Sequence, residues 1–417
     1  MSTQVIINQS PTLPNGTQAD IIYTLECPNS SSAQFKYICQ IKDDENNVLA
    51  KVKQSPNNTG LGVYDVGRLL DAQMGYDPSF TEVGFISSSN NNIRNFEIAF
   101  GAESGSSASS SLVEAVDVSA SLSSSTAFIP AVQERDSGYF NWQSGSYDIL
   151  TNCPNALDTF NETSAQNALI VSSSDYLSLS TLQGTDGNKG DLASMRIDFY
   201  NTSSFSSAFN YTEANPHAST LIEGRMIHAG VGPKNIQNLS GTIAAYLLKP
   251  DVWPYYSVFF TYASGTSKTY FFHNQCQHYK GTNFAFINKL GVFDFYRATL
   301  VDTEQEQFNR KKYDASYVDY STQSKTIAYQ YSRRGETQYY ANFKNTFTAE
   351  TDWLTQEQAD WLFELFESPS VYVQNNGDFV GVVITNANEQ YKTNNRGQKV
   401  FKFTIRYTKS NSKRART

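Results

Sequence analysis

Apolar side chains recur at every second position in many short runs of this sequence. Residues 21–27 and 35–41 show the pattern early in the chain, and residues 401–407 repeat it near the end. A period of two indicates a strand with one buried face. We therefore expect a mainly β protein made of several antiparallel β-sandwich or barrel-like domains, with a C-terminal helix packed on an antiparallel sheet.

Turn-rich and serine-rich connections divide the chain into three predicted domains. Residues 1–133 form a sandwich-like N-terminal domain, residues 134–300 a central β domain, and residues 301–417 a C-terminal β domain. Segment 104–125 holds eleven serines, which is typical of a linker. Its interruption LVEAVDV favours the other interpretation, a strand added at a sheet edge.

Two runs of the N-terminal domain are predicted to pair with each other. Residues 21–27 and 35–41 are joined by a loop rich in Pro, Asn and Ser, which suits an antiparallel pair. In that pair Cys27 and Cys39 both face inward. Four cysteines are too few for a disulfide framework in 417 residues, so we expect free thiols.

The central domain carries aromatic strands that provide the first interface candidates. Strands are predicted at residues 194–200, 242–248, 255–263 and 268–274. The run at 255–263 is apolar on both faces, so its second face is covered either by its own domain or by another subunit. The interface candidates in this run are Tyr255, Tyr256, Phe259 and Phe260.

The C-terminal domain carries the clearest helix signal. Thr355 is a predicted N-cap and Gln358 completes a capping box, so we expect a helix over residues 355–367. Its apolar stripe packs on its own sheet or contacts a neighbour in a ring. Turn signals at 375–378 and 394–397 predict antiparallel strands after the helix. The candidates here are Trp361, Leu365 and Phe366, with Trp353 beside them.

Composition narrows the classes of partner. Only 17% of residues are charged, against about 25% in average soluble chains. The 32 Lys and Arg against 40 Asp and Glu give a formal charge of −8, which argues against general nucleic-acid binding. No apolar run reaches the roughly 18 residues of a membrane span, and the first residues lack the pattern of a secretion signal. We expect a soluble protein with no membrane partner.

Motifs that would indicate catalysis, metal binding or phosphate binding are weak or absent in this sequence. His273, Cys276 and His278 are the densest group of metal-ligand types, but a strand would place His273 on the opposite side from the other two. Ordinary polar residues at a strand end are the alternative. The sequence has no nucleophile elbow and no phosphate-binding loop. We expect no metal, no cofactor and no enzymatic activity.

Basic residues gather locally in spite of the negative net charge. They occur at 310–312, at 333–334 and in the C-terminal tail. Such clusters suit docking on an acidic neighbouring subunit or contact with packaged DNA, and a solvated surface is the alternative. The tail candidates are Lys413, Arg414 and Arg416, and the tail is the one place where we expect any nucleic-acid contact.

Several segments together carry a family resemblance: GVYDVGRLL, NFEIAFGAE, YDILTNCP, FAFINKLGVFDFYRATL and DWLTQEQADWLFELFESPSVYV. The chain resembles structural proteins of tailed phages that infect Bacteroidetes, including crAss-like phages. Its C-terminal helix followed by strands is similar to the ring domain of distal-tail and tail-hub proteins. The resemblance implies a ring- or hub-forming virion subunit of the tail or neck, assembled in the bacterial cytoplasm with copies of itself and other virion proteins.

A second hypothesis belongs to a different class. A receptor- or glycan-binding tail or head fibre protein also has a sandwich-like domain and exposed aromatic side chains. Trp142 and Trp253 are the aromatic candidates for that role.

Overall fold

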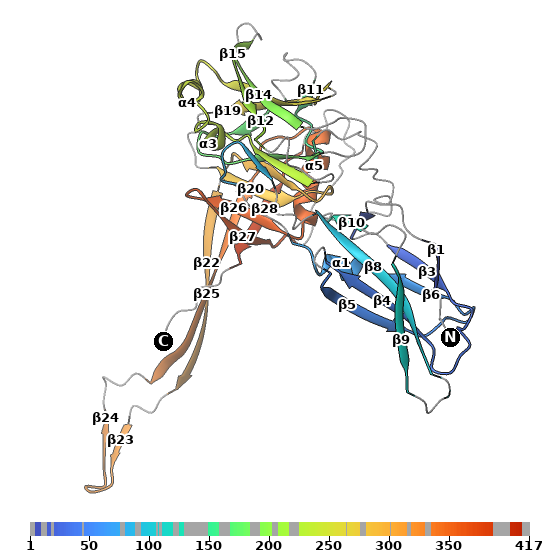
Figure 1. Cartoon of the computed structure of the whole chain (residues 1–417). Coiled ribbons are helices and arrows are strands. Elements are labelled where there is room, and N and C mark those ends of the chain that lie inside the picture. The colour runs from blue at the N-terminus through green and yellow to red at the C-terminus, as the bar shows by residue number, and fades with distance from the viewer. Residues whose placement is uncertain are drawn as a thin grey trace, which may run out of the picture.

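The computed structural model of the chain describes residues 5–9, 15–17, 21–43, 46–75, 80–87, 93–105, 107, 111–119, 125–128, 149–157, 167–183, 192–201, 207–216, 225–263, 265–275, 281–300, 302–314, 318–329, 335–386 and 401–410. The protein is mainly β, with several antiparallel sheets and a C-terminal helix, as the periodicity predicts (Figure 1).

The N-terminal domain is a sandwich of two sheets. The smaller sheet has the order β1-β3-β6, from Ile6–Gln9, Ile22–Glu26 and Gly62–Asp65. The larger has the order β2-β10-β8-β4-β5, with β9 beside β8. Its strands are Asn15–Gly16, Ser125–Phe128, Ile93–Ser104, Lys36–Lys42, Val48–Gln54 and Val113–Ser119, and the short helix α1 (Gly67–Asp71) follows β6. The rings of Tyr23 and Phe100 meet across the core at 5.1 Å.

The predicted pairing of 21–27 with 35–41 is wrong. Strand β3 pairs with β1 and β6, whereas β4 pairs with β5 and β8, so the two runs lie in different sheets. A period of two fixes which side chains face inward but not which strand lies alongside. Cys27 and Cys39 do face the core as free thiols, and burial raises the pKa of the Cys39 thiol to about 12. The LVEAVDV interruption lies in strand β9, in agreement with the second interpretation of the serine-rich segment.

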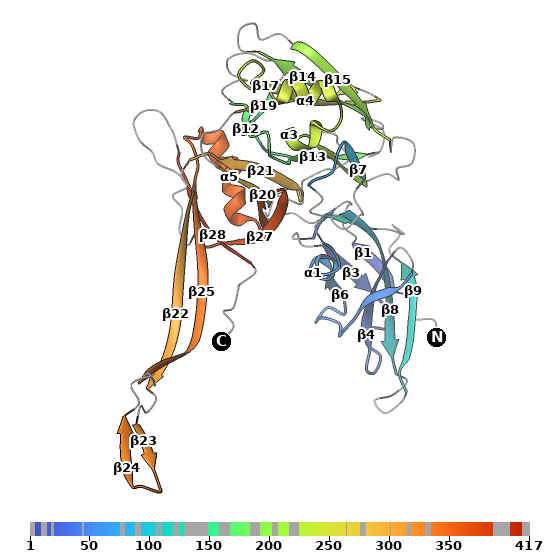
Figure 2. The ribbon, with the colours of Figure 1, turned by 90° about the vertical axis from the view of Figure 1, so that its left-hand side faces the viewer.

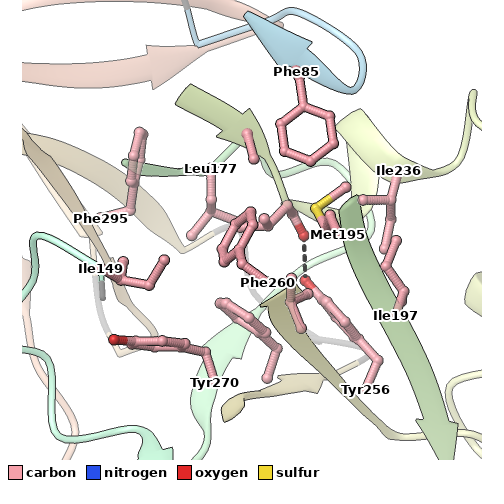
Figure 3. Packing of buried hydrophobic residues seen from close by; sticks show 14 of the residues in the cluster. Phe85, Ile149, Leu177, Met195, Ile197, Ile236, Tyr256, Phe260, Tyr270 and Phe295 are labelled. Carbon is pink, nitrogen blue, oxygen red and sulfur yellow. Dashed lines mark hydrogen bonds between the residues drawn. The ribbon is translucent and has the colours of Figure 1, made fainter. Parts of the chain in front are cut away.

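The central sheet has the order β11-β19-β17-β14-β15, with β12 beside β19 and β18 beside β17. These strands are Ala156–Leu157, Thr269–Asn274, Tyr255–Tyr262, Leu192–Tyr200, Ser207–Ala214, Leu169–Val171 and Gly265–Thr266. A three-stranded sheet, β13-β16-β7, packs against it from Ser178–Gln183, Arg225–Gly230 and Phe85–Ser87. Tyr256 lies inside this core, where its hydroxyl donates a hydrogen bond to the Val231 carbonyl at 3.0 Å (Figure 3).

Residues 242–248 are not the strand that we expected. They lie in helix α4 (Gly241–Leu247), which follows the short helix α3 (Pro233–Ile236). The Ser240 hydroxyl caps α4 by accepting a hydrogen bond from the Thr242 amide. Ile243 and Leu247 are four residues apart and both buried, so a single helical turn accounts for the apolar positions.

The C-terminal sheet has the order β21-β20-β26-β27-β28-β25-β22. Its strands are Phe293–Ala298, Thr282–Ile287, Val371–Asn375, Asp378–Ile384, Thr404–Lys409, Glu336–Glu350 and Asp302–Asp314. Helix α5 (Gln356–Glu367) packs on it and has the predicted capping box: the Gln358 amide donates to Thr355 Oγ1 at 3.3 Å, and the Thr355 amide donates to Gln358 Oε1 at 3.0 Å.

The domains share elements across the predicted boundaries. Strands β20 and β21 precede residue 300 yet pair within the C-terminal sheet, and β7 precedes residue 133 yet pairs with β16. The Phe80 ring lies 4.5 Å from that of Phe379. Sheets recruit strands that are distant in the sequence, so connection composition alone does not locate these boundaries.

Two buried carboxyl groups hold α5 against the sheet. Trp361 donates its indole N–H to Asp294 Oδ2 at 2.7 Å, and Glu364 accepts hydrogen bonds from the Lys289 amide and the Asn152 side chain, each at 3.0 Å. Burial, assisted by the nearby Glu364, raises the pKa of Asp294 to about 7. Burial also raises the pKa of Glu364.

Asp294→Asn is expected to stabilise the protein at alkaline pH. Because the folded-state pKa of Asp294 is raised, its contribution to stability is complete below about pH 4 and is lost as the pH rises through about 7. The amide keeps the acceptor for Trp361 and removes the buried charge. Thermal unfolding at pH 8 and pH 4 should show a gain of up to about 4 kcal/mol at pH 8 and little change at pH 4. Asp360→Asn on the exposed face of α5 is the matched control. Equal effects of Asp294→Asn at both pH values would contradict the assignment.

Candidate assembly surface

A long two-stranded arm leaves the C-terminal sheet. Strand β25 pairs with β28 only over Phe347–Glu350, whereas it pairs with β22 along the whole of Asp302–Asp314. Residues 336–346 therefore extend beyond the sheet with β22 as their partner (Figures 1 and 2). At about 3.4 Å per residue, the thirteen residues of β22 span roughly 44 Å.

The arm is anchored by aromatic packing at its base. The Phe347 ring stacks on Tyr407 at 5.2 Å, and Lys409 Nζ lies 4.9 Å from the Phe347 ring centroid. Tyr407 in turn meets Phe284 edge-on at 5.4 Å. Phe347 and Ala349 belong to the core under α5, so the last residues of β25 are fixed in the body.

Beyond its base the arm is exposed to solvent. Every residue of β22 is exposed, including Phe308 at 55% and Tyr313 at 51%. Contacts within the ribbon support its shape: Tyr313 lies 5.9 Å from Tyr339, Arg310 lies over Phe308 at 5.3 Å, and Lys312 forms a 2.7 Å ion pair with Glu336. An isolated two-stranded ribbon is only marginally stable in water, so exposure of this length points to a role in contact with something else.

A second small hairpin lies beyond the arm. Strands β23 (Val318–Ser321) and β24 (Thr326–Tyr329) pair antiparallel, and Lys325 adopts a positive φ of 48° in the turn between them. Tyr320 and Ile327 are opposite each other in register and exposed at 62% and 59%. Large exposed apolar side chains at the end of a projection are typical of a contact surface.

Charge is segregated along the arm. Residues near the body are acidic, whereas residues 307–344 contain seven Lys and Arg and three Asp and Glu. The remainder of the chain then holds 25 Lys and Arg and 37 Asp and Glu, from totals of 32 and 40. The distal arm is therefore a positive projection on a negative chain, and such opposed charges steer association.

The apolar interface candidates differ in how far their side chains are buried. Tyr256, Phe260, Trp361 and Leu365 are buried in cores of their own chain, so they do not reach a neighbour in this conformation. Tyr255, Phe259 and Phe366 are half-buried. Trp353 is 66% exposed. Lys413, Arg414 and Arg416 lie outside the described residues.

Sequence reasoning noticed the basic clusters at 310–312 and 333–334 but missed the arm. Its strands lack the apolar alternation that marks a half-buried strand, because both faces meet solvent. A usable signal was present in the similar lengths of two polar runs, 302–314 and 336–350, of which the second is rich in Thr, Tyr and Phe.

Trp353 lies at a cleft of about 200 Å³ between β12, β19 and the start of α5. The cleft is lined by Asp352, Gln358, Arg297, Tyr296, His273 and Cys153 among others. Burial raises the pKa of the Cys153 thiol and lowers the pKa of His273, which opposes formation of a reactive thiolate beside a charged imidazole.

The candidate metal residues are only partly visible. His273 is the last residue but one of β19 and stacks on Tyr255 at 4.5 Å, whereas Cys276 and His278 lie outside the described residues. Within the described ranges no group of three His, Cys, Asp or Glu is placed to hold a metal ion. Those ranges also contain no helix that is both long and apolar enough to cross a membrane.

The aromatic candidates for glycan binding also differ. Trp253 is half-buried and lies 5.1 Å from Tyr246, whereas Trp142 is outside the described residues.

No protein-family model matches the chain, and a search of curated proteins finds no match either.

Replacing residues 307–344 with Asn-Gly is expected to leave the body folded. Glu306 and Asn345 are opposite each other in register, so a two-residue turn can join them. The removed residues contribute nothing to the three main described cores, and the unfolding midpoint should move by no more than about 2 °C. Circular dichroism during heating measures this.

Phe347→Ala is the matched variant at the arm base. It removes a core ring and should lower stability by about 3 kcal/mol. A large loss of stability in the Asn-Gly variant would mean that the distal arm supports the body.

Proposed function

We propose that this chain is a structural subunit of a tailed-phage particle that forms a ring or hub in the tail or neck through protein–protein interfaces. Its partners are other copies of itself and other virion proteins, and it is located in the virion after assembly in the bacterial cytoplasm. The fold-level resemblance of residues 355–417 to ring domains supports this role by analogy.

The observation that carries the proposal is the arm. Strand β22 is exposed over thirteen residues and carries Phe308, Arg310 and Tyr313 on its surface, which are residue types enriched at interfaces. Ten residues of β22 extend beyond the part of β25 that pairs with β28, a projection of about 34 Å. An enzyme that acts alone gains nothing from such a projection, whereas a subunit that must reach its neighbour does.

The arm variant also tests this function. Native mass spectrometry of the purified wild-type protein should show closed complexes of several copies, and the Asn-Gly replacement of residues 307–344 should shift the population to complexes of fewer copies. When both proteins are supplied during particle assembly, the replacement variant should be depleted from particles at least tenfold. A wild-type protein that is strictly monomeric in solution and present as one copy per particle would overturn the proposal.

A receptor- or glycan-binding fibre protein is the second candidate function, and the cleft at Trp353 favours it. An exposed indole beside the Asp352 carboxylate and the Gln358 amide offers the stacking and hydrogen-bonding that saccharides require. If this function holds, wild-type protein will bind glycans on an array or host cells, and Trp353→Ala will reduce binding at least tenfold. Trp253→Ala tests the other aromatic candidate, which lies outside the cleft. Equal binding by both variants would count against a site at this cleft.

A further inference from the structure

Strand β22 has a free edge along the arm. It is the last strand of its sheet within the described residues, since it follows β25 in the order and pairs with no other described strand. Backbone groups on its outer edge alternate between N–H and C=O, as in any strand that awaits a partner. A long exposed edge is a template for pairing with another chain.

We propose that β22 of one copy pairs antiparallel with β22 of a second copy about a two-fold axis near Phe308. This inference rests on the proposed assembly function and names the partner of the arm. The pairing adds backbone hydrogen bonds across the two arms and joins two ribbons into one four-stranded sheet.

The order of charges in β22 makes the strand complementary to itself. Asp302, Glu304 and Glu306 occupy its first half. Arg310, Lys311 and Lys312 occupy its second half, which ends in Asp314. Antiparallel pairing sets the acidic half of each copy against the basic half of the other, whereas parallel pairing sets like charges together.

In a register centred on Phe308, each residue close to the two-fold axis is opposite a residue of compatible charge or type. Glu306 of one copy is then opposite Arg310 of the other, and the two-fold axis repeats this ion pair. Phe308 is opposite its own equivalent, which gives an aromatic cross-strand pair. Gln307 is opposite Asn309, a neutral pair. Only complementary or neutral partners meet from 305 to 311.

Charged residues on an edge strand often serve to prevent pairing. That effect requires charges that repel in every available register, such as one sign along the whole strand. In β22 the acidic residues of 302–306 and the basic residues of 310–312 are segregated, and only the pairs of Asp302 with Asp314 at the two ends repel each other in the antiparallel register. The charges therefore oppose parallel partners and uncharged strands while favouring a second β22. They select one occupant.

Nucleic acid is the competing occupant for a basic, aromatic arm. Residues 307–344 contain seven basic residues, but four carboxylates of β22 lie on the same strand and repel phosphate. Pairing with a second copy engages both the acidic and the basic half of β22, whereas a polyanion contacts only the basic half. The full charge pattern therefore favours the second copy.

A two-fold contact joins copies in pairs and closes on itself. A ring of these subunits then needs a second and different contact, which the pairing of arms does not supply. Pairing of arms and closure of a ring are therefore separable in experiment.

Complementary charge reversals test the pairing in the full-length protein. Glu306→Lys places positive charge opposite Arg310 at two sites of the pair, and Arg310→Glu places negative charge opposite Glu306 at two sites. Each variant alone should dimerise at least tenfold more weakly in sedimentation equilibrium. An equimolar mixture of the two should recover the wild-type affinity, because an arm with one sign then meets an arm with the other.

The controls carry the same charge changes elsewhere. Lys325→Glu in the turn of the second hairpin and Glu357→Lys on α5 are both exposed and should leave dimerisation unchanged. If the mixture of Glu306→Lys and Arg310→Glu stays as weak as its components, the pairing is wrong. A loss of binding to duplex DNA in Arg310→Glu, with unchanged self-association, would identify the polyanion as the occupant and also overturn the inference.

Cysteine cross-linking tests the register and direction. A Phe308→Cys variant should form a disulfide-linked dimer on mild oxidation, because the two-fold axis places this position opposite itself. Thr303→Cys should not, since antiparallel pairing separates it from its equivalent by ten residues, roughly 34 Å. Cross-linking at both positions would indicate a parallel arrangement and overturn the proposal. Particles that contain many copies without these cross-links would contradict only the pairing of β22 strands. Particles that contain a single copy would contradict the proposed function.

Discussion

Strand β25 is shared between a buried sheet and an exposed ribbon, and the position of the arm depends on that continuity. Its last residues pair with β28 and contribute Phe347 to the core, where the ring stacks on Tyr407. Its first residues pair with β22 alone. A single extended backbone carries the rigidity of the core outward, because a strand inside a ladder bends less readily than a loop. The arm is therefore an extension of the fold and not an appended tail.

The sequence predicts well those features that depend on local chemistry. The capping residues Thr355 and Gln358 determine where α5 begins, and alternation determines which residues of β3 face a core. Strand partners are harder to predict, because identical alternation in 21–27 and 35–41 suits one sheet or two facing sheets. The error at 242–248 has a related cause: seven residues hold too few apolar positions to separate a period of two from a helical turn capped by Ser240.

The candidate assembly surface was partly predictable. Its basic residues are visible in the sequence, but the strands that carry them lack a buried face and so lack the usual signal. The apolar candidates show the opposite failure. Trp361 and Tyr256 look like interface residues by type, yet each has a buried hydrogen-bond acceptor in its own chain, Asp294 and the Val231 carbonyl respectively. Residue type suggests what can be buried, and only the three-dimensional arrangement decides against what.

The register of β22 and β25 also has an evolutionary consequence. Both strands leave the body side by side, and the residues between Glu306 and Asn345 contribute to none of the three main described cores. Inserting two residues into each strand lengthens the ribbon by about 7 Å and keeps every side chain on its face, whereas inserting one reverses the faces. Lineages of this protein can thus change the reach of the arm in even-numbered steps, free of the selection that preserves the body.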